Sequence, residues 1–454
     1  MMIADRMNPI VLKELRQGLK SKAFVASFLG LQVLMVMSMF IFFASVSSNS
    51  GDMEFANGFF WFMLGVILML FMPLRSFGAL YGEMKGDTLE MLFLTRMFSW
   101  DIAFGKWLAL LLQIGLLVCA VLPYLVLRYY LGSVNITADF VQLGLQVVGS
   151  SMLVAMGVGL SAWTNKVLRG LLIFFALTSL YGLPLLLFSF TRTGMSAFAL
   201  WKWWDPVIWF CVLVLIMLYF VEYGASQIAP HAENHSIRKR AFALGVGVVL
   251  IPYAVFLERT IVPLAVGLSL LVPVLIDTLC EPVYHIRSLY RPPRKWRVFR
   301  LFLFPGWPSS MLFILLMLAA FLGAGFLITK DSEFAIWVLV FLNIVLYPFL
   351  FIRLFPRLSK KPILSYILFQ VGSLLLFILF AILVETLPGP SVFEWASYAI
   401  FPAAGFYEVM DDGIDDFVLG LLILPTLATL SIHLLKAVPL WRAMFRLGKE
   451  AEVS

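Results

Sequence analysis

The sequence predicts an all-α protein, a polytopic transmembrane helical bundle of about twelve spans with both termini in the cytoplasm. Three observations lead to this fold class. Hydrophobic residues make up 62% of the 454-residue chain and charged residues only 13%, whereas a soluble domain is typically about half apolar and about a quarter charged. Apolar runs of about 20 residues, enough to cross the hydrocarbon core as a helix, recur along the chain. Lys and Arg residues gather in alternate connecting segments.

Twelve apolar runs follow one another in order. Those of the first half cover about 23–46, 58–80, 103–127, 139–163, 168–190 and 206–224. Those of the second half cover about 241–257, 260–280, 301–328, 334–355, 362–384 and 417–440. The seventh and eighth are the weakest, because both are short and only Glu258, Arg259 and Thr260 separate them.

The charge distribution orients these spans. If the N-terminus is inside, the inside segments carry 28 Lys and Arg residues and the outside loops carry 5. Cytoplasmic loops of membrane proteins hold an excess of Lys and Arg, so both termini are predicted to be cytoplasmic. The net charge of +7 is therefore explained by basic residues that orient the spans and contact the lipid bilayer. A nucleic-acid partner is not expected, because no folded basic domain remains to bind one.

The segments between the spans are too short for a catalytic domain. The longest outside loop, about 385–416, has just over 30 residues, and a phosphate-binding loop of the form G-x-x-x-x-G-K-[ST] is absent from the sequence. We therefore expect neither enzymatic activity nor a cofactor or metal. His231-Ala-Glu233-Asn-His235 and the acidic segment 411–416 contain metal-ligand residue types, but a solvated loop is the favoured interpretation of each. Titratable residues lie near span ends, which argues against an ion-driven transporter.

Residues 7–22 predict an amphipathic helix that lies in the membrane interface. Asn8 is a suitable N-cap, and Pro9 suits the first helical position. Leu12, Leu15 and Leu19 share one face. The opposite face carries the polar residues Lys13, Glu14, Arg16, Gln17 and Lys20. A generic charged flank is the alternative.

The inside loop after the second span is the most unusual stretch of the chain. Gly86 interrupts it, Asp87 or Thr88 can cap a short helix, and Glu90 falls in the first turn of that helix. The helix would be apolar nearly all round, with Leu89, Met91, Leu92, Phe93 and Leu94. A second helix start at Ser99-Trp100-Asp101 leads into the third span. A short apolar helix between charges suits docking into a groove on another protein; a re-entrant or lipid-surface helix is the alternative.

Both segments resemble parts of one family. Asn8-Pro9-Ile10-Val11-Leu12-Lys13-Glu14-Leu15-Arg16 resembles the interfacial elbow helix of bacterial type-2 ATP-binding-cassette (ABC) permeases. The inside loop of this chain resembles the loop after span two in that family. The matching residues are Glu83, Gly86, Asp87, Thr88, Leu89, Glu90, Leu92, Leu94 and Thr95, followed by Gly105-Lys106 and Leu122-Pro123. One departure is the insertion of Asp87 into the usual E-x-x-x-G-T-L-E pattern. The resemblance covers about residues 7–224.

The resemblance implies a permease subunit of an exporter in the bacterial cytoplasmic (inner) membrane. It also implies that the loop carries a coupling helix, which seats on a separate ABC ATP-binding subunit. Reversing the charges of Glu83 and Glu90 should then uncouple ATP hydrolysis from transport. A secondary transporter and a non-transporting assembly or anchor protein stay open as alternative functions. The 43 Phe residues favour a hydrophobic cargo, although lipid-facing helices need the same composition.

Members of this family typically have six spans. Residues 1–230 would therefore form the permease module with its elbow helix and coupling loop, and residues 231–454 a second six-span module that could be a diverged repeat. An even number of spans keeps two such modules in the same orientation. They could form one pseudo-dimeric pore, or the pore could need a second copy of the chain or another permease subunit.

Overall fold

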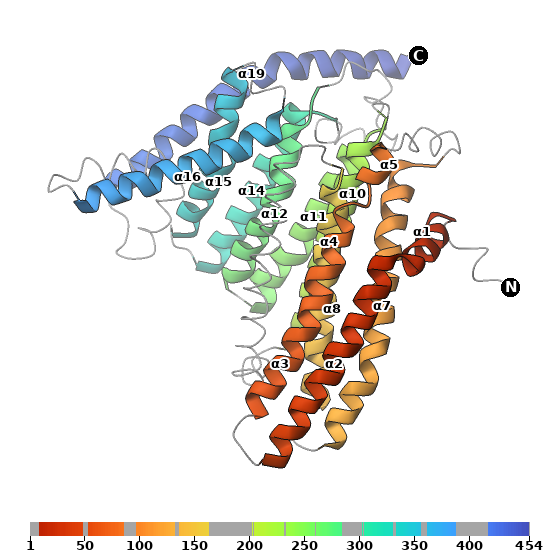
Figure 1. The fold of residues 1–454 in the computed structure, drawn as a ribbon. Helices are drawn as coiled ribbons and strands as arrows, with labels where there is room; N and C mark the ends of the chain where they lie inside the picture. Colours follow the sequence, from red (N-terminus) through yellow and green to blue (C-terminus); the bar gives the residue numbers. More distant parts are fainter. Residues whose placement is uncertain are drawn as a thin grey trace. The chain divides into compact units, whose positions relative to one another are not determined.

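The chain divides into two compact units, Met1–Pro230 and His231–Ser454. The computed structural model describes residues 9–48, 53–85, 97–131, 136–162, 202, 204–230, 233–258, 260–283, 302, 304–329, 333–355, 361–386 and 416–453. All regular secondary structure in these ranges is helical (Figure 1). The all-α class predicted from the sequence is therefore confirmed for this part of the chain.

Within the described ranges, eight helices are long and apolar enough to cross a membrane. They are Lys22–Val46, Phe55–Met84, Ser99–Tyr130, Ile136–Leu160, Asp205–Ile228, Ser236–Glu258, Val262–Cys280 and Trp307–Ile328. The chain is thus a multi-pass membrane protein. The last three predicted spans also fall on helices, whereas the predicted span 168–190 lies outside the described residues. A total of about twelve spans and the cytoplasmic side of both termini stay predictions.

The first unit consists of one short amphipathic helix followed by long apolar ones. Its helices are α1 (Pro9–Lys20), α2 (Lys22–Ser48), α3 (Met53–Gly65), α4 (Met72–Ser76), α5 (Tyr81–Lys85), α7 (Ser99–Tyr130), α8 (Ile136–Leu160) and α10 (Asp205–Ile228). A π-helical stretch, η2 (Val66–Phe71), joins α3 to α4, and Pro73 is the second residue after it. Proline lacks the backbone N–H that a regular helix needs, which explains the irregular hydrogen bonding here.

Helices α8 and α10 approach each other closely at two glycines. A Cβ atom added to Gly159 would lie 2.4 Å from the carbonyl oxygen of Phe220, and one added to Gly224 would lie 3.0 Å from the Cα atom of Gly159. No side chain fits at either position without a shift of backbone. Small residues allow such contact between helices in a membrane, where dispersion rather than hydrophobic burial drives association.

Figure 1 shows α1 turning away from the axis of α2. The corner between them is held by Ser21, whose hydroxyl donates to the Gly18 carbonyl at 2.6 Å and accepts from the Phe24 amide at 3.2 Å. The Arg75 guanidinium, at the end of α4, donates to the same hydroxyl at 3.2 Å and lies over the Phe24 ring. The corner is therefore fixed to the second span as well as to its own helices.

The second unit repeats the pattern of long apolar helices. It contains α11 (Ser236–Pro252), the π-helical η3 (Tyr253–Glu258), α12 (Val262–Cys280), α14 (Trp307–Thr329), α15 (Glu333–Leu354), α16 (Pro362–Thr386) and α19 (Asp416–Val453). Helix α19 continues well past the predicted end of its span at residue 440 and changes direction along its length (Figure 1). Pro439 lies within it and can cause such a bend. Beyond that proline, Met444 packs against the buried Phe304 ring, with Val283, Trp441 and Leu447 around them.

Candidate functional site at the base of the predicted coupling loop

The amphipathic helix α1 lies against the N-terminal half of α7. It begins at Pro9, where the sequence places the first helical residue, and buries Ile10 and Val11. Near its other end, a Cβ atom on Gly18 would come within 2.2 Å of the Gln113 amide nitrogen of α7. The two helices therefore stay in contact over most of the length of α1.

Lys106 of α7 lies where three elements of the first unit meet. Its ammonium group is 2.6 Å from Glu14 Oε1 of α1 and 3.1 Å from Glu83 Oε1 of α5. The Lys106 side chain is only 6% exposed, against 24% for Glu14 and 14% for Glu83. A buried ammonium is tolerated only when it is paired and hydrogen-bonded, and here two carboxylates meet that need. We call these three side chains the Lys106 clamp.

The clamp closes the base of the loop that the sequence singles out. Glu83 lies just before the loop, and α7 begins at Ser99 just after it, the start predicted from Ser99-Trp100-Asp101. Phe98 has extended backbone angles, and Asp101 lies in the first turn of α7, where a negative charge is favourable. The chain therefore leaves and re-enters the helical bundle beside one buried ion cluster.

The structure brings two of the predicted site residues together, Glu14 and Glu83, through Lys106. Of the other elbow residues, Pro9 and Arg16 are exposed, while Leu12 and Leu15 are half-buried. Asn8 and most of the predicted coupling residues lie outside the described part of the chain, namely Gly86, Asp87, Thr88, Leu89, Glu90, Leu92, Leu94 and Thr95. Glu14 differs from its assignment to the polar face of the helix: it faces α7, because Lys106 offers it a buried partner.

A second buried cation lies at the opposite end of α7. Arg128 is fully buried, and its guanidinium is 3.3 Å from Asp139 Oδ2 of α8 and hydrogen-bonded to Asn57 of α3. It also lies over the Phe60 ring, 4.3 Å from its centroid. In the sequence, Arg128 is one of a few basic residues assigned to outside loops, and nothing in the local pattern distinguishes it. The sequence alone therefore does not predict this cluster.

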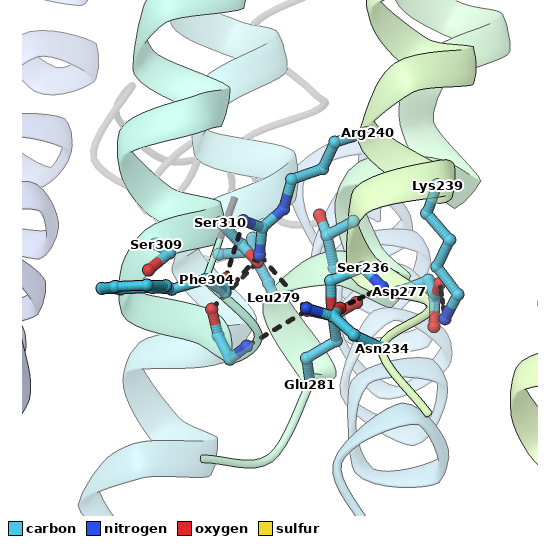
Figure 2. A network of polar contacts seen from close by, with 12 residues as sticks. Asn234, Ser236, Lys239, Arg240, Asp277, Leu279, Glu281, Phe304, Ser309 and Ser310 are labelled. Atoms are coloured by element: carbon cyan, nitrogen blue, oxygen red, sulfur yellow. Dashed lines mark hydrogen bonds and ion pairs between the residues drawn. The ribbon is translucent and has the colours of Figure 1, made fainter. Parts of the chain in front are cut away.

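The second unit contains a comparable network around Arg240 of α11 (Figure 2). Arg240 is 1% exposed, and its guanidinium donates to the carbonyl oxygens of Phe302 at 2.5 Å and Phe304 at 2.8 Å and to the Ser310 hydroxyl at 2.8 Å. It also pairs with Glu281 at 3.3 Å. Glu281 follows the end of α12, and Ser310 lies in the first turn of α14, so the network again joins three elements at the base of a connecting segment.

Neighbouring contacts reinforce the Arg240 network. The Ser236 hydroxyl and the Gly306 amide both donate to Glu281 Oε2, and Lys239 pairs with Asp277 at 2.7 Å (Figure 2). In the first unit the buried cation is on the helix that follows the loop. In the second unit the buried cation, Arg240, is on α11, the most N-terminal helix of that unit. The positions of the cation and the anion along the chain therefore differ between the two networks.

The structure corrects the interpretation of the His231–His235 segment as a solvated loop. His231 lies outside the described residues, but His235 is buried, with its ring Nε2 3.0 Å from Glu233 Oε2. The reason is local, since the His235 carbonyl accepts from the Lys239 amide and opens helix α11. Across the described ranges, no group of three or more His, Cys, Asp or Glu side chains is arranged to hold a metal ion.

Comparison of the chain with protein-family models, with curated proteins and with solved structures finds no significant match.

Proposed function

We propose that this chain is the membrane-spanning permease subunit of an ABC transporter, an exporter driven by a separate ATP-binding subunit in the bacterial cytoplasmic membrane. The observation that carries the proposal is the Lys106 clamp. It ties the interfacial helix, the entry to the predicted coupling loop and the helix after the loop to one another at two charged contacts of 2.6 and 3.1 Å.

A loop that receives force from a motor protein needs a stiff connection to the helices that it moves. Without the clamp, displacement of the loop could be absorbed by bending of its two ends. With the clamp, the loop, α1 and α7 have to move together or break a buried ion pair, which is costly. Rigid-body movement of packed helices is one of the ordinary ways in which a membrane protein changes state. The clamp therefore suits a coupling role better than a passive connection.

The distribution of buried charge favours this function over a secondary transporter. Ion-coupled transporters place ionisable groups near the middle of the membrane. In the described part of this chain, the buried ion pairs formed by Lys106, Arg128, Lys239 and Arg240 lie within about two turns of an end of their helices. Ion pairs at these positions stabilise the ends of helices. In the proposed function, the energy for transport therefore comes from another subunit.

The first test is purification of the full-length protein in a mild detergent, followed by identification of any co-purifying chain and by an ATPase assay. We expect a subunit with a phosphate-binding loop, and we expect Glu90→Lys in the coupling loop to reduce its recovery. Glu54→Lys is the matched control, because it makes the same charge reversal on the predicted outer side. Equal recovery with all three proteins, or no nucleotide-hydrolysing partner, would contradict the proposal.

Glu83 is unsuitable as a probe of docking, although the sequence places it beside Glu90. Glu83→Lys would set a second ammonium about where the carboxylate now lies, 3.1 Å from Lys106, inside the clamp. Loss of coupling in that variant would then report damage to the fold. Glu90 is separated from the clamp along the sequence and gives the cleaner result.

The subunit count is a second test, aimed at the role of the second unit. If residues 231–454 act as the second half of the pore, one copy of this chain should purify with two ATPase subunits. If the pore needs a second copy of the chain or another permease subunit, the complex should contain two permease chains. Native mass spectrometry of the purified complex distinguishes these stoichiometries. Transport of a hydrophobic cargo by the reconstituted complex, strictly dependent on ATP, would separate a transporter from an anchor protein.

A further inference from the structure

A half-buried arginine without a carboxylate partner among the described residues lies in the second unit. Arg353, next to the last residue of α15, stacks over the Trp307 ring at 3.5 Å from its centroid and donates weakly to the Leu279 carbonyl at 3.5 Å. Its Nη1 atom is buried and makes no hydrogen bond. Within the described residues, Arg353 therefore contacts aromatic rings and a carbonyl oxygen, but its charge is not neutralised.

Two further nitrogen-bearing side chains of α19 lie beside Arg353. Lys436 donates to the Arg353 carbonyl oxygen at 3.1 Å, and its side chain is exposed. His433 is three residues earlier, on the same side of the helix, and is 1% exposed. Its Nδ1 atom is 2.7 Å from the Thr429 carbonyl oxygen, and its Nε2 atom is buried without a hydrogen-bond partner. Because a carbonyl oxygen only accepts, Nδ1 carries the proton, and the neutral ring presents Nε2 as an acceptor that cannot donate to an anion.

The carboxylates at this end of the second unit already have partners. Asp277 is paired with Lys239, and Glu281 with Arg240. The inside segments 284–303 and 356–361, which adjoin α14, α15 and α16 in the sequence, contain several Arg and Lys residues but neither Asp nor Glu. Two cations are therefore gathered at this end of the second unit, and the carboxylates described there are already paired.

We propose that Arg353 and Lys436 form a binding site for a phosphate group, carried by an anionic phospholipid headgroup or by free phosphate. A planar guanidinium donates in parallel to phosphate oxygens, and the Trp307 stack fixes its orientation for this. The Nη1 atom of Arg353 is buried without an acceptor, and a phosphate supplies both an acceptor and a counter-charge from outside the chain. The site depends only on the second unit, so it stands apart from the proposed coupling to an ATPase.

The position of the site favours a lipid headgroup as the source of the phosphate. Arg353 and Leu279 lie at the C-terminal ends of α15 and α12, and Trp307 is the first residue of α14. The sequence assigns all three ends to the cytoplasmic side, where anionic lipids bind in basic pockets between transmembrane helices. The exposed Lys436 would lie at the rim of the site, where a headgroup enters.

The test uses the full-length protein in three settings: nanodiscs of phosphatidylcholine alone, nanodiscs that also contain phosphatidylglycerol, and lipid-depleted detergent with added inorganic phosphate. Retained lipid is counted by native mass spectrometry, and the midpoint of thermal unfolding is measured in each setting. Lys436→Gln should weaken phosphatidylglycerol retention about fivefold, the effect of removing one cation near a charged headgroup. Arg442→Gln is the matched control, because Arg442 is exposed on the same helix and the charge change is identical. Arg353→Gln should have a larger effect, but its burial makes Lys436→Gln the safer variant.

Loss of retention in Lys436→Gln but not in Arg442→Gln supports the site with a lipid as its ligand. Stabilisation of the wild type by inorganic phosphate, sensitive to Lys436→Gln, supports the same site with free phosphate. If the wild type responds to neither source, or if the two variants lose phosphatidylglycerol equally, the proposal is wrong and the cluster is an internal feature of the fold.

Discussion

Replacing Lys106 by Met tests whether the clamp holds the first unit together. The substitution keeps the length and most of the volume of the side chain but removes the ammonium. Glu14 and Glu83 are then left facing each other at the base of the loop without the cation that now lies 2.6 and 3.1 Å from them. Because both carboxylates are largely shielded from water, at 24% and 14% exposure, they cannot recover their full hydration.

The expected magnitude follows from this burial. Removing one partner of a buried ion pair costs about 3–5 kcal/mol, and an exposed pair contributes about 1 kcal/mol or less. The partial exposure of Glu14 and Glu83 places Lys106→Met at the lower end of the first range, about 3 kcal/mol. Glu83→Gln should cost only about 1 kcal/mol, because Lys106 keeps its shorter contact with Glu14.

Equilibrium unfolding in mixed micelles measures these changes, with Lys20→Met on the exposed side of α1 as the control for removal of a lysine charge. The triple variant Lys106→Met/Glu14→Gln/Glu83→Gln should regain much of the lost stability, because no buried charge is left unpaired. A free energy of unfolding for Lys106→Met within about 0.5 kcal/mol of the wild type, the spread expected of a surface substitution, would show that the clamp does not stabilise the first unit. A triple variant less stable than Lys106→Met would also contradict this role of the clamp.

Three further predictions use the same unfolding assay. Gly159→Ala should destabilise the first unit by about 1–3 kcal/mol through overpacking. Gly144→Ala is the control and should be neutral or stabilising, because nothing lies within 4 Å of its Cβ position. Equal effects of the two substitutions would contradict the close approach of α8 and α10. Arg128→Met should cost about 3 kcal/mol by leaving a buried carboxylate unpaired, and a neutral result would mean that this cluster is hydrated. Arg240→Met should lower stability far more than Arg238→Met, since Arg238 is exposed. Similar losses of stability would mean that the network around Arg240 contributes little to the fold.

The positions of the helices could be predicted from the sequence because hydropathy and helix-start signals are local. Pro9 begins α1 and Ser99 begins α7, both at positions where the residue types favour a helix start. The end of the last helix was harder to predict. Helix α19 runs to Val453 because Trp441 and Met444 pack on the residues around Phe304, a tertiary contact that a hydropathy window does not detect.

The partners of the charged side chains could not be predicted in the same way. The pattern of α1 places Glu14 among polar residues, and only the fold brings Lys106 to it from 92 positions along the chain. The same holds for Arg240 and Glu281, which are 41 positions apart. Positive-inside counting treats each basic residue alike and assigns it to a side of the membrane. It does not distinguish a solvated anchor such as Arg238 from a buried residue such as Arg240.

The two buried cations of α7 give a measure of the membrane that does not depend on hydropathy. Lys106 and Arg128 are 22 residues apart in one helix, which corresponds to a rise of about 33 Å at 1.5 Å per residue. The hydrocarbon core of a bilayer is about 30 Å thick, and charged groups near its centre are costly. Each cation therefore lies where a carboxylate partner can be kept close to an interface, Glu14 and Glu83 at one end and Asp139 at the other. Because both ends of α7 are fixed to neighbouring helices in this way, a displacement of the loop beside Lys106 would carry through a single continuous helix to the cluster around Arg128.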